Sequence, residues 1–200
     1  MSRGLFIAFE GIDGSGKSTH ARRIARETGA LFTFEPGDSE LGVQLRELLL
    51  HAKVALTPET EALLMLSDRS HHVASTIAPT LAQGRAVIAD RFLASTISYQ
   101  GYGRGVNLDL LWRATDLAVG DVRPDLTIVF DLPVEVAARR RAPRDDDRFE
   151  RSGPQFQERV RQGLLEMADG NPTYAVIDAS GNHDHVAAQL TAALSAVGLL

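Results

Sequence analysis

The stretch that decides the fold reads Gly11-Ile12-Asp13-Gly14-Ser15-Gly16-Lys17-Ser18, a full match to the pattern G-x-x-x-x-G-K-[ST]. A short apolar run at 5–9 precedes it, and a helical pattern over 17–28 follows. Glycines in such a loop let backbone N–H groups close around phosphate oxygens. The helix that follows adds the partial positive charge of its N-terminus. The stretch therefore predicts binding of a nucleoside triphosphate.

Two side chains of this loop carry specific expectations. Lys17 is expected to reach the β- and γ-phosphates, and the Ser18 hydroxyl to bind Mg²⁺. The alternative is a glycine-rich turn with a fortuitous lysine, but only two of the 21 basic residues are lysines, Lys17 and Lys53. The residues expected to hold the nucleotide are Gly11, Ile12, Asp13, Gly14, Ser15, Gly16, Lys17, Ser18 and Thr19.

Short strand patterns alternate with longer helical patterns along the chain. Strands are expected at 5–9, 31–34, 86–89, 126–131 and 174–178, and helices at 17–28, 41–51, 57–83, 109–117, 134–140, 154–168 and 185–197. Continuously apolar strands predict a sheet buried on both faces, and the alternation predicts parallel βαβ units. We expect one α/β domain over residues 1–200, with a five-stranded parallel sheet flanked by helices on both faces.

Composition narrows the class of protein. The 200 residues are 44% hydrophobic and 24% charged, which excludes disorder as the overall state. There is no cysteine, so disulfides, thiolate zinc sites and a cysteine nucleophile are excluded. The net charge of −5 argues against nucleic-acid binding through a basic surface. No apolar run is long enough for a signal peptide or a membrane helix, so we expect a cytoplasmic protein with no membrane partner.

A second polar pair follows the strand pattern at 86–89. Asp90 and Arg91 would lie at the carboxyl edge of the sheet, where open α/β folds bind ligands. Asp90 could hold Mg²⁺ through water, and Arg91 could clamp a phosphate with its forked guanidinium. The alternative is a structural ion pair that closes the strand.

Residues 139–151, RRRAPRDDDRFER, are the one compositional anomaly, with six arginines and four acidic residues. Such a stretch cannot bury itself well, so we expect an exposed excursion within the domain. Phosphoryl transfer needs charge neutralisation and exclusion of water, which a lid over residues 139–152 would supply. The alternative is a solvated, self-neutralising charge run.

Several short motifs occur in a fixed order from residue 5 to about residue 170. They are the loop at 10–18, then Glu35-Pro36-Gly37, Asp68-Arg69, Asp90-Arg91-Phe92 with Ser95 and Ser98-Tyr99-Gln100-Gly101, and finally Asp147-Arg148-Phe149-Glu150. Together they resemble the thymidylate kinase family. The resemblance implies a P-loop NTPase fold and transfer of the γ-phosphoryl group of ATP to dTMP, giving dTDP and ADP in dTTP synthesis.

The resemblance also implies roles for individual residues. Asp13 would contact the 3′-hydroxyl region of the acceptor and help to organise the metal, and Arg91 would grip the acceptor phosphate, assisted by Arg46. Arg69 would donate to the thymine carbonyl, and Tyr99 would pack where a 2′-hydroxyl would collide with it. The expected substrate-binding residues are Asp13, Glu35, Pro36, Arg46, Met65, Arg69, Arg91, Ser95, Thr96, Tyr99 and Gln100.

Physical chemistry supports the roles of Arg69 and Tyr99 independently of the resemblance. An arginine that donates to a base carbonyl rejects cytosine, whose amine presents a donor there, and an aromatic wall at C2′ excludes ribose. The alternatives are an ordinary core aromatic for Tyr99 and a helix-surface charge for Arg69. The loop that begins at Ala179-Ser180 is expected to border the adenine.

The resemblance links the arginines expected in the lid to one position in the phosphate loop. Family members with glycine at the position of Gly14 use arginines in the lid, so the resemblance implies roles for Arg144 and Arg148, while Arg139, Arg140 and Arg141 could instead finish the preceding helix. The expected catalytic residues are Lys17, Asp13, Arg91, Arg144 and Arg148.

Three positions depart from the family pattern. Met65 stands where an aromatic side chain normally stacks on thymine, Phe34 where many relatives carry arginine, and Leu164 where tyrosine is common. The first leaves open a kinase for another pyrimidine nucleotide or a deoxynucleoside. A non-catalytic nucleotide switch is the alternative outside the enzymes. The resemblance also implies a homodimer formed through the helices before and after Asp90.

Overall fold

The computed structural model describes residues 3–51, 54–140 and 148–200. Its core is a five-stranded sheet in the order β2-β3-β1-β4-β5, in which all neighbouring strands are parallel. The strands are β1 Phe6–Glu10, β2 Leu31–Phe34, β3 Val87–Asp90, β4 Leu126–Asp131 and β5 Tyr174–Asp178. All five predicted strands are confirmed, and β1 and β3 are each shifted by one residue along the chain.

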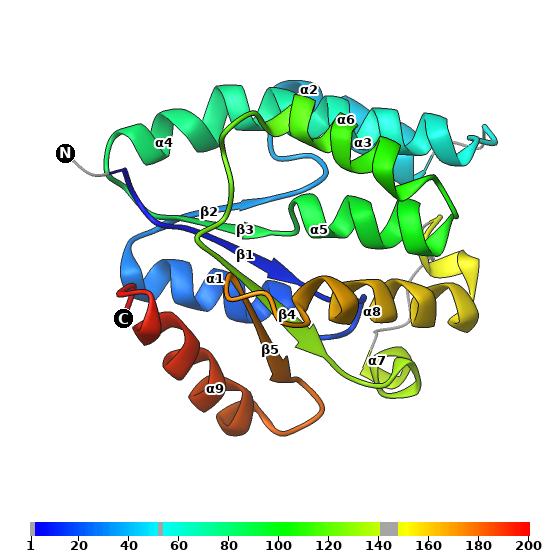
Figure 1. The fold of residues 1–200 in the computed structure, drawn as a ribbon. Coiled ribbons are helices and arrows are strands. Elements are labelled where there is room, and N and C mark those ends of the chain that lie inside the picture. Colours follow the sequence, from blue (N-terminus) through cyan, green and yellow to red (C-terminus); the bar gives the residue numbers. More distant parts are fainter. Residues whose placement is uncertain (1–2, 52–53, 141–147) are drawn as a thin grey trace.

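Helices cover both faces of this sheet (Figure 1). They are α1 Lys17–Thr28, α2 Glu40–Leu50, α3 Pro58–His72, α4 Ala78–Ala82, α5 Leu93–Thr96, α6 Leu108–Val119, α7 Val134–Arg140, α8 Pro154–Ala168 and α9 His183–Ala196. Helix α1 packs against β1, β2 and β3, and α8 packs against β4 and β5. The upper layer in Figure 1 holds α2, α3, α4 and α6, while α9 lies below the sheet.

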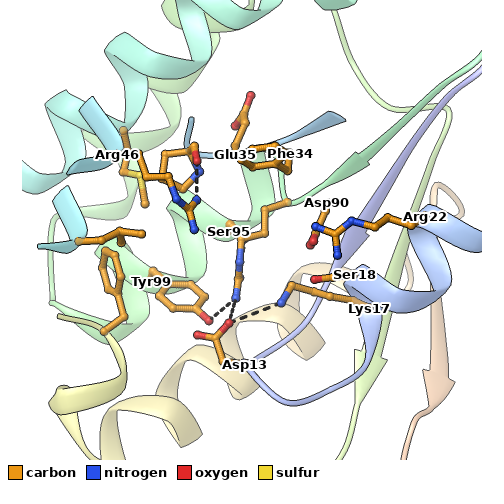
Figure 2. Close-up of a pocket in the computed structure, with 15 residues that line it drawn as sticks. Asp13, Lys17, Ser18, Arg22, Phe34, Glu35, Arg46, Asp90, Ser95 and Tyr99 are labelled. Atoms are coloured by element: carbon orange, nitrogen blue, oxygen red, sulfur yellow. Dashed lines mark hydrogen bonds and ion pairs between the residues drawn. The ribbon is translucent and has the colours of Figure 1, made fainter. Parts of the chain in front are cut away.

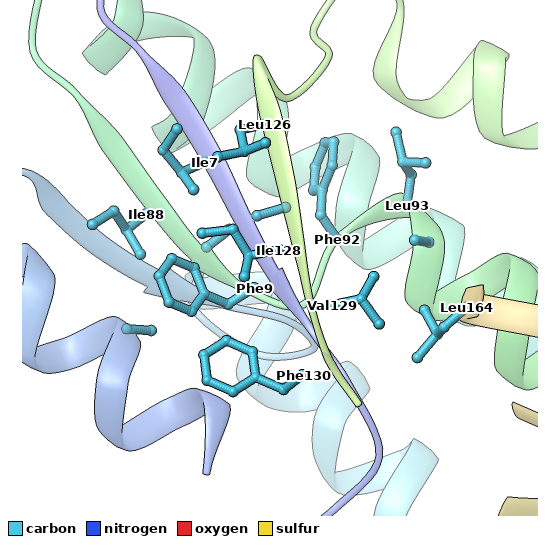
Figure 3. Packing of buried hydrophobic residues seen from close by; sticks show 14 of the residues in the cluster. Ile7, Phe9, Ile88, Phe92, Leu93, Leu126, Ile128, Val129, Phe130 and Leu164 are labelled. Atoms are coloured by element: carbon cyan, nitrogen blue, oxygen red, sulfur yellow. The ribbon is translucent and has the colours of Figure 1, made fainter. Parts of the chain in front are cut away.

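The central strands β1, β3 and β4 are buried because they are apolar on both faces, whereas the edge strands β2 and β5 are partly exposed. All five residues of β1 are buried, and Phe9 lies 5.6 Å from Phe130 between ring centroids. These two rings face α1, whereas Val129 and Leu164 lie on the opposite side of the strands (Figure 3). Polar groups are displaced to the carboxyl ends, where four of the five strands finish with an acidic residue: Glu10, Asp90, Asp131 and Asp178.

The predicted long helix over 57–83 is confirmed with one change. It consists of α3, a π-helical segment η1 (Val73–Ile77) and α4, which follow one another without a gap. The other predicted helices are confirmed to within two residues at each end. Within the described residues, no helix is long and apolar enough to cross a bilayer.

One helical region was not predicted. Helix α5 continues into a second π-helical segment, η2 (Ile97–Gly103), and together they carry residues expected to bind the acceptor. Every residue of 93–103 except Tyr102 is buried. Because polar and apolar residues of this segment are buried alike, its sequence shows no 3.6-residue alternation of exposed and buried positions from which a helix could be predicted.

The arginine-rich stretch is described only at its two ends. Arg139 and Arg140 close α7, which confirms that they finish the preceding helix. Arg140 also donates to the carbonyls of Ala179 and Ser180, at 2.6 and 2.9 Å, and so ties the loop after β5 to this helix. The chain is described again from Arg148, before the short 3₁₀ helix η3 (Glu150–Ser152). Arg141 and Arg144 lie outside the described residues.

Candidate active site

A cavity of about 520 Å³ opens at the carboxyl edge of the sheet, above the ends of β1, β2 and β3. Figure 2 shows side chains from the phosphate loop, α2, β3 and η2 converging on it. The residues that line it are Asp13, Lys17, Ser18, Arg22, Phe34, Glu35, Pro36, Arg46, Leu50, Met65, Asp90, Arg91, Ser95, Tyr99 and Phe149. Eleven predicted site residues are therefore brought together: Asp13, Lys17, Ser18, Glu35, Pro36, Arg46, Met65, Asp90, Arg91, Ser95 and Tyr99.

The phosphate loop has the backbone that its glycines predict. Gly16 precedes α1 with φ +88°, a left-handed conformation that favours glycine, and no side chain of the described residues caps this helix end. A Cβ at Gly11 would lie 2.9 Å from the carbonyl oxygen of Phe130, so the loop also needs the absence of a side chain there. The first N–H groups of α1 are thus available to an anion.

Lys17 points into the cavity from the first turn of α1. It is 5% exposed, and its Nζ lies 3.6 Å from Oδ1 of Asp13. Burial, together with the neighbouring guanidinium of Arg91, lowers the pKa of Lys17 below its ordinary value. A second anion near Lys17 would offset both effects, which makes this position receptive to phosphate.

Arg91 is the centre of the polar cluster. Its guanidinium donates to Oδ1 of Asp13 at 2.8 Å, to the Tyr99 hydroxyl at 2.9 Å and to Oγ of Ser95 at 3.1 Å. It also lies 4.8 Å from the centre of the Tyr99 ring. Its backbone φ of +74° is left-handed, which costs about 1–3 kcal/mol for a residue with a side chain. The surrounding contacts hold this strained turn, as is typical of ligand sites.

Burial and the neighbouring acidic groups have opposite effects on the charge of Arg91. Burial alone would lower the pKa of Arg91, but Tyr99, Asp13, Asp90 and Glu10 around it hold that pKa above its ordinary value. Burial in turn raises the pKa of the Tyr99 phenol, which the Arg91 charge only partly offsets. The site therefore presents a fixed cation beside a neutral hydroxyl, with Asp13 as the nearest counter-charge.

Glu10 supports this turn from behind and was not predicted as a site residue. It is fully buried at the end of β1 and accepts from the backbone N–H groups of Phe92 and Ser95, at 2.9 and 3.1 Å, and from the Ser95 hydroxyl. Burial raises the pKa of Glu10, and the Ser95 hydrogen bond opposes that rise. The carboxylate satisfies the first N–H groups of α5 and so fixes the path of the chain after Arg91. The signal was an acidic residue closing a buried strand.

The residues expected to hold Mg²⁺ fit that ion. Asp90 is 8% exposed, and its buried Oδ1 has no hydrogen-bond partner among the described residues. Ser18 lines the same cavity with its hydroxyl. Carboxylate and hydroxyl oxygens are ligands that Mg²⁺ accepts alongside phosphate and water. In the described part of the chain, no three His, Cys, Asp or Glu side chains gather into a site of their own for a metal.

The acceptor side of the cavity is built around Glu35. Its carboxylate accepts from Nε of Arg69 at 2.7 Å and pairs with Nδ1 of His72 at 2.9 Å. Arg69 is 2% exposed and also donates to Oγ1 of Thr96 at 2.7 Å and to the Phe92 carbonyl at 2.8 Å. Arg69 and Thr96 thus lie immediately behind the cavity wall and do not line it. Arg69 is no helix-surface charge.

Three further predicted residues have specific places. Gln100 is fully buried, donates from Nε2 to Glu61 at 3.0 Å and is not among the residues that line the cavity. Arg46 donates to the Pro36 carbonyl at 2.6 Å, and its guanidinium lies 5.6 Å from the centre of the Phe34 ring. Arg148 donates to the carbonyl of residue 54 at 2.9 Å and does not line the cavity.

Four lining residues were not predicted to be part of the site: Arg22, Phe34, Leu50 and Phe149. Arg22 is one helical turn after Ser18, so the helical repeat itself placed it on the same face. Phe149 stacks edge-on against Tyr99, with ring centroids 5.5 Å apart, which joins the end of the arginine-rich stretch to the cavity wall.

Comparison with known proteins agrees with this geometry. A family model described as thymidylate kinase matches residues 9–190. This chain belongs to the thymidylate kinase family. The thymidylate kinase of Geobacter sulfurreducens is 47% identical over 203 residues, covering 94% of each chain, and that of Cupriavidus metallidurans is 46% identical, covering 92% of this chain and 94% of that one.

A solved structure, that of a thymidylate kinase from Ehrlichia chaffeensis, superposes with a TM-score of 0.79 at 33% identity and covers 96% of this chain and 99% of that one. As a member of the thymidylate kinase family, the chain is a nucleoside-monophosphate kinase with the P-loop NTPase fold. These matches give no support to a nucleotide switch or to another acceptor.

Proposed function

We propose that this member of the thymidylate kinase family transfers the γ-phosphoryl group of ATP to dTMP through the cavity described above, giving dTDP and ADP in the supply of dTTP. The observation that carries the proposal is the placement of Lys17 and Arg91 in one cavity, with Asp13 between them at 3.6 and 2.8 Å. Lys17 belongs to the phosphate loop, and Arg91 faces a space large enough for a nucleotide. Two anionic substrates can therefore meet there.

The donor is held by the phosphate loop. The backbone N–H groups of 11–19 surround the β-phosphate, and Lys17 follows the γ-phosphate as charge develops on it. Ser18 and Asp90 are the residues that would hold Mg²⁺. When bound, that ion neutralises phosphate oxygens and orients them. The loop after β5, at Ala179 and Ser180, borders the adenine.

The acceptor is held by the opposite wall. Arg91 and Arg46 bind the dTMP phosphate in line with the donor, and Asp13 accepts from the 3′-hydroxyl. Tyr99 packs against C2′, where its buried ring leaves no room for a ribose hydroxyl. Glu35 holds Arg69 toward the base. The remaining acceptor residues are Pro36, Met65, Ser95, Thr96 and Gln100.

Charge compensation is completed by the lid segment at 139–152. Arg144 and Arg148 supply guanidiniums to the transferring phosphoryl group, where delocalised negative charge develops. Support comes from Phe149, near the end of this segment, which packs on Tyr99 and lines the cavity. A closed lid also excludes water, which would otherwise accept the phosphoryl group.

The enzyme acts as a homodimer in the cytoplasm. Apolar side chains stand exposed on the helices before and after Asp90, including Leu63 of α3 and Leu110 and Leu117 of α6. Helices α3 and α6 pack against each other, so these side chains lie on neighbouring elements. Exposed apolar surface of this kind marks a protein–protein contact.

The test is ADP formation from Mg-ATP with dTMP, dUMP, UMP, dCMP, AMP or thymidine offered separately. Fast turnover with dTMP, slower turnover with dUMP and little with UMP is the expected order. Equal rates with dUMP or UMP would mean that Met65 leaves the base site open to other pyrimidines. ATP binding with no acceptor-dependent ADP would contradict phosphoryl transfer altogether.

A further inference from the structure

Two buried hydrogen bonds join α3 to the helix that runs through α5 and η2. Glu61, Met65 and Arg69 are spaced four residues apart and so lie on one face of α3. Arg69 at one end donates to Thr96, and Glu61 at the other accepts from Gln100. Met65, midway between them on the same face, lines the cavity. The two hydrogen bonds therefore flank the part of the wall that the base would meet.

A buried carboxylate takes part in the hydrogen bonding at each of these two places. Glu35 accepts from Nε of Arg69 at 2.7 Å, and Glu61 accepts from Nε2 of Gln100 at 3.0 Å. Arg104 keeps Glu61 in place with two contacts, at 3.2 and 3.3 Å, and lies 4.6 Å from the centre of the Phe156 ring. Glu61 is 2% exposed, so this arrangement is enclosed.

The chemistry of Glu61 decides how the Gln100 amide is oriented. An ionised carboxylate only accepts hydrogen bonds, so the amide must turn its NH₂ group toward Glu61. The Gln100 oxygen is left facing away from the carboxylate. This Oε1 is buried and has no hydrogen-bond partner among the described residues. Buried acceptors in folded proteins are nearly always satisfied, so its donor comes from water or from a bound ligand.

We propose that Glu61 is a specificity-determining positioning residue, which fixes Gln100 as a hydrogen-bond acceptor toward the nucleotide base. The proposal rests on the acceptor being a nucleotide held as described above. The N3–H group of thymine or uracil can donate to a fixed acceptor, whereas N3 of cytosine is itself an acceptor and would be repelled. An amide free to turn over could satisfy either base, so selectivity would be lost without Glu61.

The test compares the ratio of kcat/KM for dTMP to that for dCMP in the wild type, Glu61→Gln, Gln100→Ala and the double variant. Glu61→Gln presents a donor as well as an acceptor and releases the amide. We expect the ratio to fall by about tenfold or more, with the KM for ATP unchanged. The double variant is expected to match Gln100→Ala, because Glu61 acts through Gln100.

The matched control is Asp116→Asn, another carboxylate-to-amide change at an arginine pair, here with Arg123 on the surface. It should leave the ratio unchanged. If Glu61→Gln does not fold, Glu61→Asp keeps the charge but withdraws it from Gln100, and the ratio should still fall. A ratio that stays constant in either Glu61 variant, or losses that add in the double variant, would overturn the proposal. A wild type inactive on dTMP would instead contradict the proposed function.

Discussion

Arg91 makes three side-chain hydrogen bonds at once, which a lysine ammonium at this position could not make with the same geometry. Its planar guanidinium donates to Asp13, Tyr99 and Ser95 at once, while its own backbone sits in the left-handed region. Lysine carries the same charge as a single point and cannot match this fork of donors. The geometry therefore depends on the identity of this residue as well as on its charge.

Arg91→Lys should reduce kcat/KM for dTMP by about 10²–10³-fold, the typical loss when one oriented donor is removed from a transition state. The KM for ATP should change less than about twofold, because the donor site keeps Lys17 and its loop. Steady-state kinetics with each substrate varied will measure both. Arg123→Lys is the control, since Arg123 pairs with Asp116 on the surface. Near-wild-type activity of Arg91→Lys would remove Arg91 from phosphate binding.

Asp68 couples the stability of the acceptor wall to pH. Burial, followed by the charge of Glu35, raises the pKa of Asp68 from its ordinary 3.8 to about 6, while its carboxylate accepts from the backbone N–H of Gly37 at 3.3 Å. A carboxyl with a higher pKa in the folded than in the unfolded protein stabilises the fold at low pH. That contribution is lost as pH rises from about 4 to 6.

Asp68→Asn should therefore flatten the fall in unfolding free energy between about pH 4 and 6, by up to about 3 kcal/mol. The amide retains an oxygen for Gly37 but does not ionise. Urea unfolding at a series of pH values will measure the difference. The same change at the exposed Asp109, on the surface of α6, should leave the pH profile as it is. Parallel profiles for the wild type and Asp68→Asn would rule out Asp68 as the titrating group.

At the scale of elements, the sequence could predict the sheet but only part of the site. All five strands are short apolar runs that could be recognised from sequence alone, and the phosphate loop is recognisable by its glycine spacing. The helix through 93–103 was missed because burial on every side removes the alternation that marks a helix. Glu10 and Glu61 were missed for a related reason. Each acts on a neighbour distant in sequence, Ser95 or Gln100, and only the fold brings them together.

The segment at 139–152 is the element whose role is most open to test. Arg148→Ala should lower kcat at least about tenfold while the KM for dTMP stays within about twofold, because lid arginines act on the charge that develops during transfer. The control is Arg123→Ala, because Arg123 pairs with Asp116 on the surface and lies outside this segment. Initial-rate kinetics at saturating ATP will separate the two constants. An unchanged kcat for Arg148→Ala would remove Arg148 from the reaction.

At the scale of the whole molecule, the prediction concerns assembly. A chain of 21.7 kDa that pairs through α3 and α6 should sediment as a species of twice that mass. Leu63→Glu and Leu110→Glu together should shift it to the monomer, since two charges would be buried at the contact. Val176→Glu, an exposed apolar position on β5, is the control. Analytical ultracentrifugation will measure the mass of each variant. A monomeric wild type would contradict dimerisation, and a dimer that persists in the double variant would show that the contact is not formed by these side chains.

The strand order also determines when each strand can find its partners during synthesis of the chain. Phe6 pairs with Val87 and Ile7 with Leu126, so the first strand to leave the ribosome waits for partners made much later. Such long-range pairing slows folding and keeps an apolar segment exposed in the nascent chain. The phosphate loop after β1 can complete its packing only after β4 has been synthesised, because Gly11 of the loop packs against Phe130 of β4. A truncated transcript would therefore yield a chain unable to hold ATP, and nucleotide capture would report that translation has passed well beyond its midpoint.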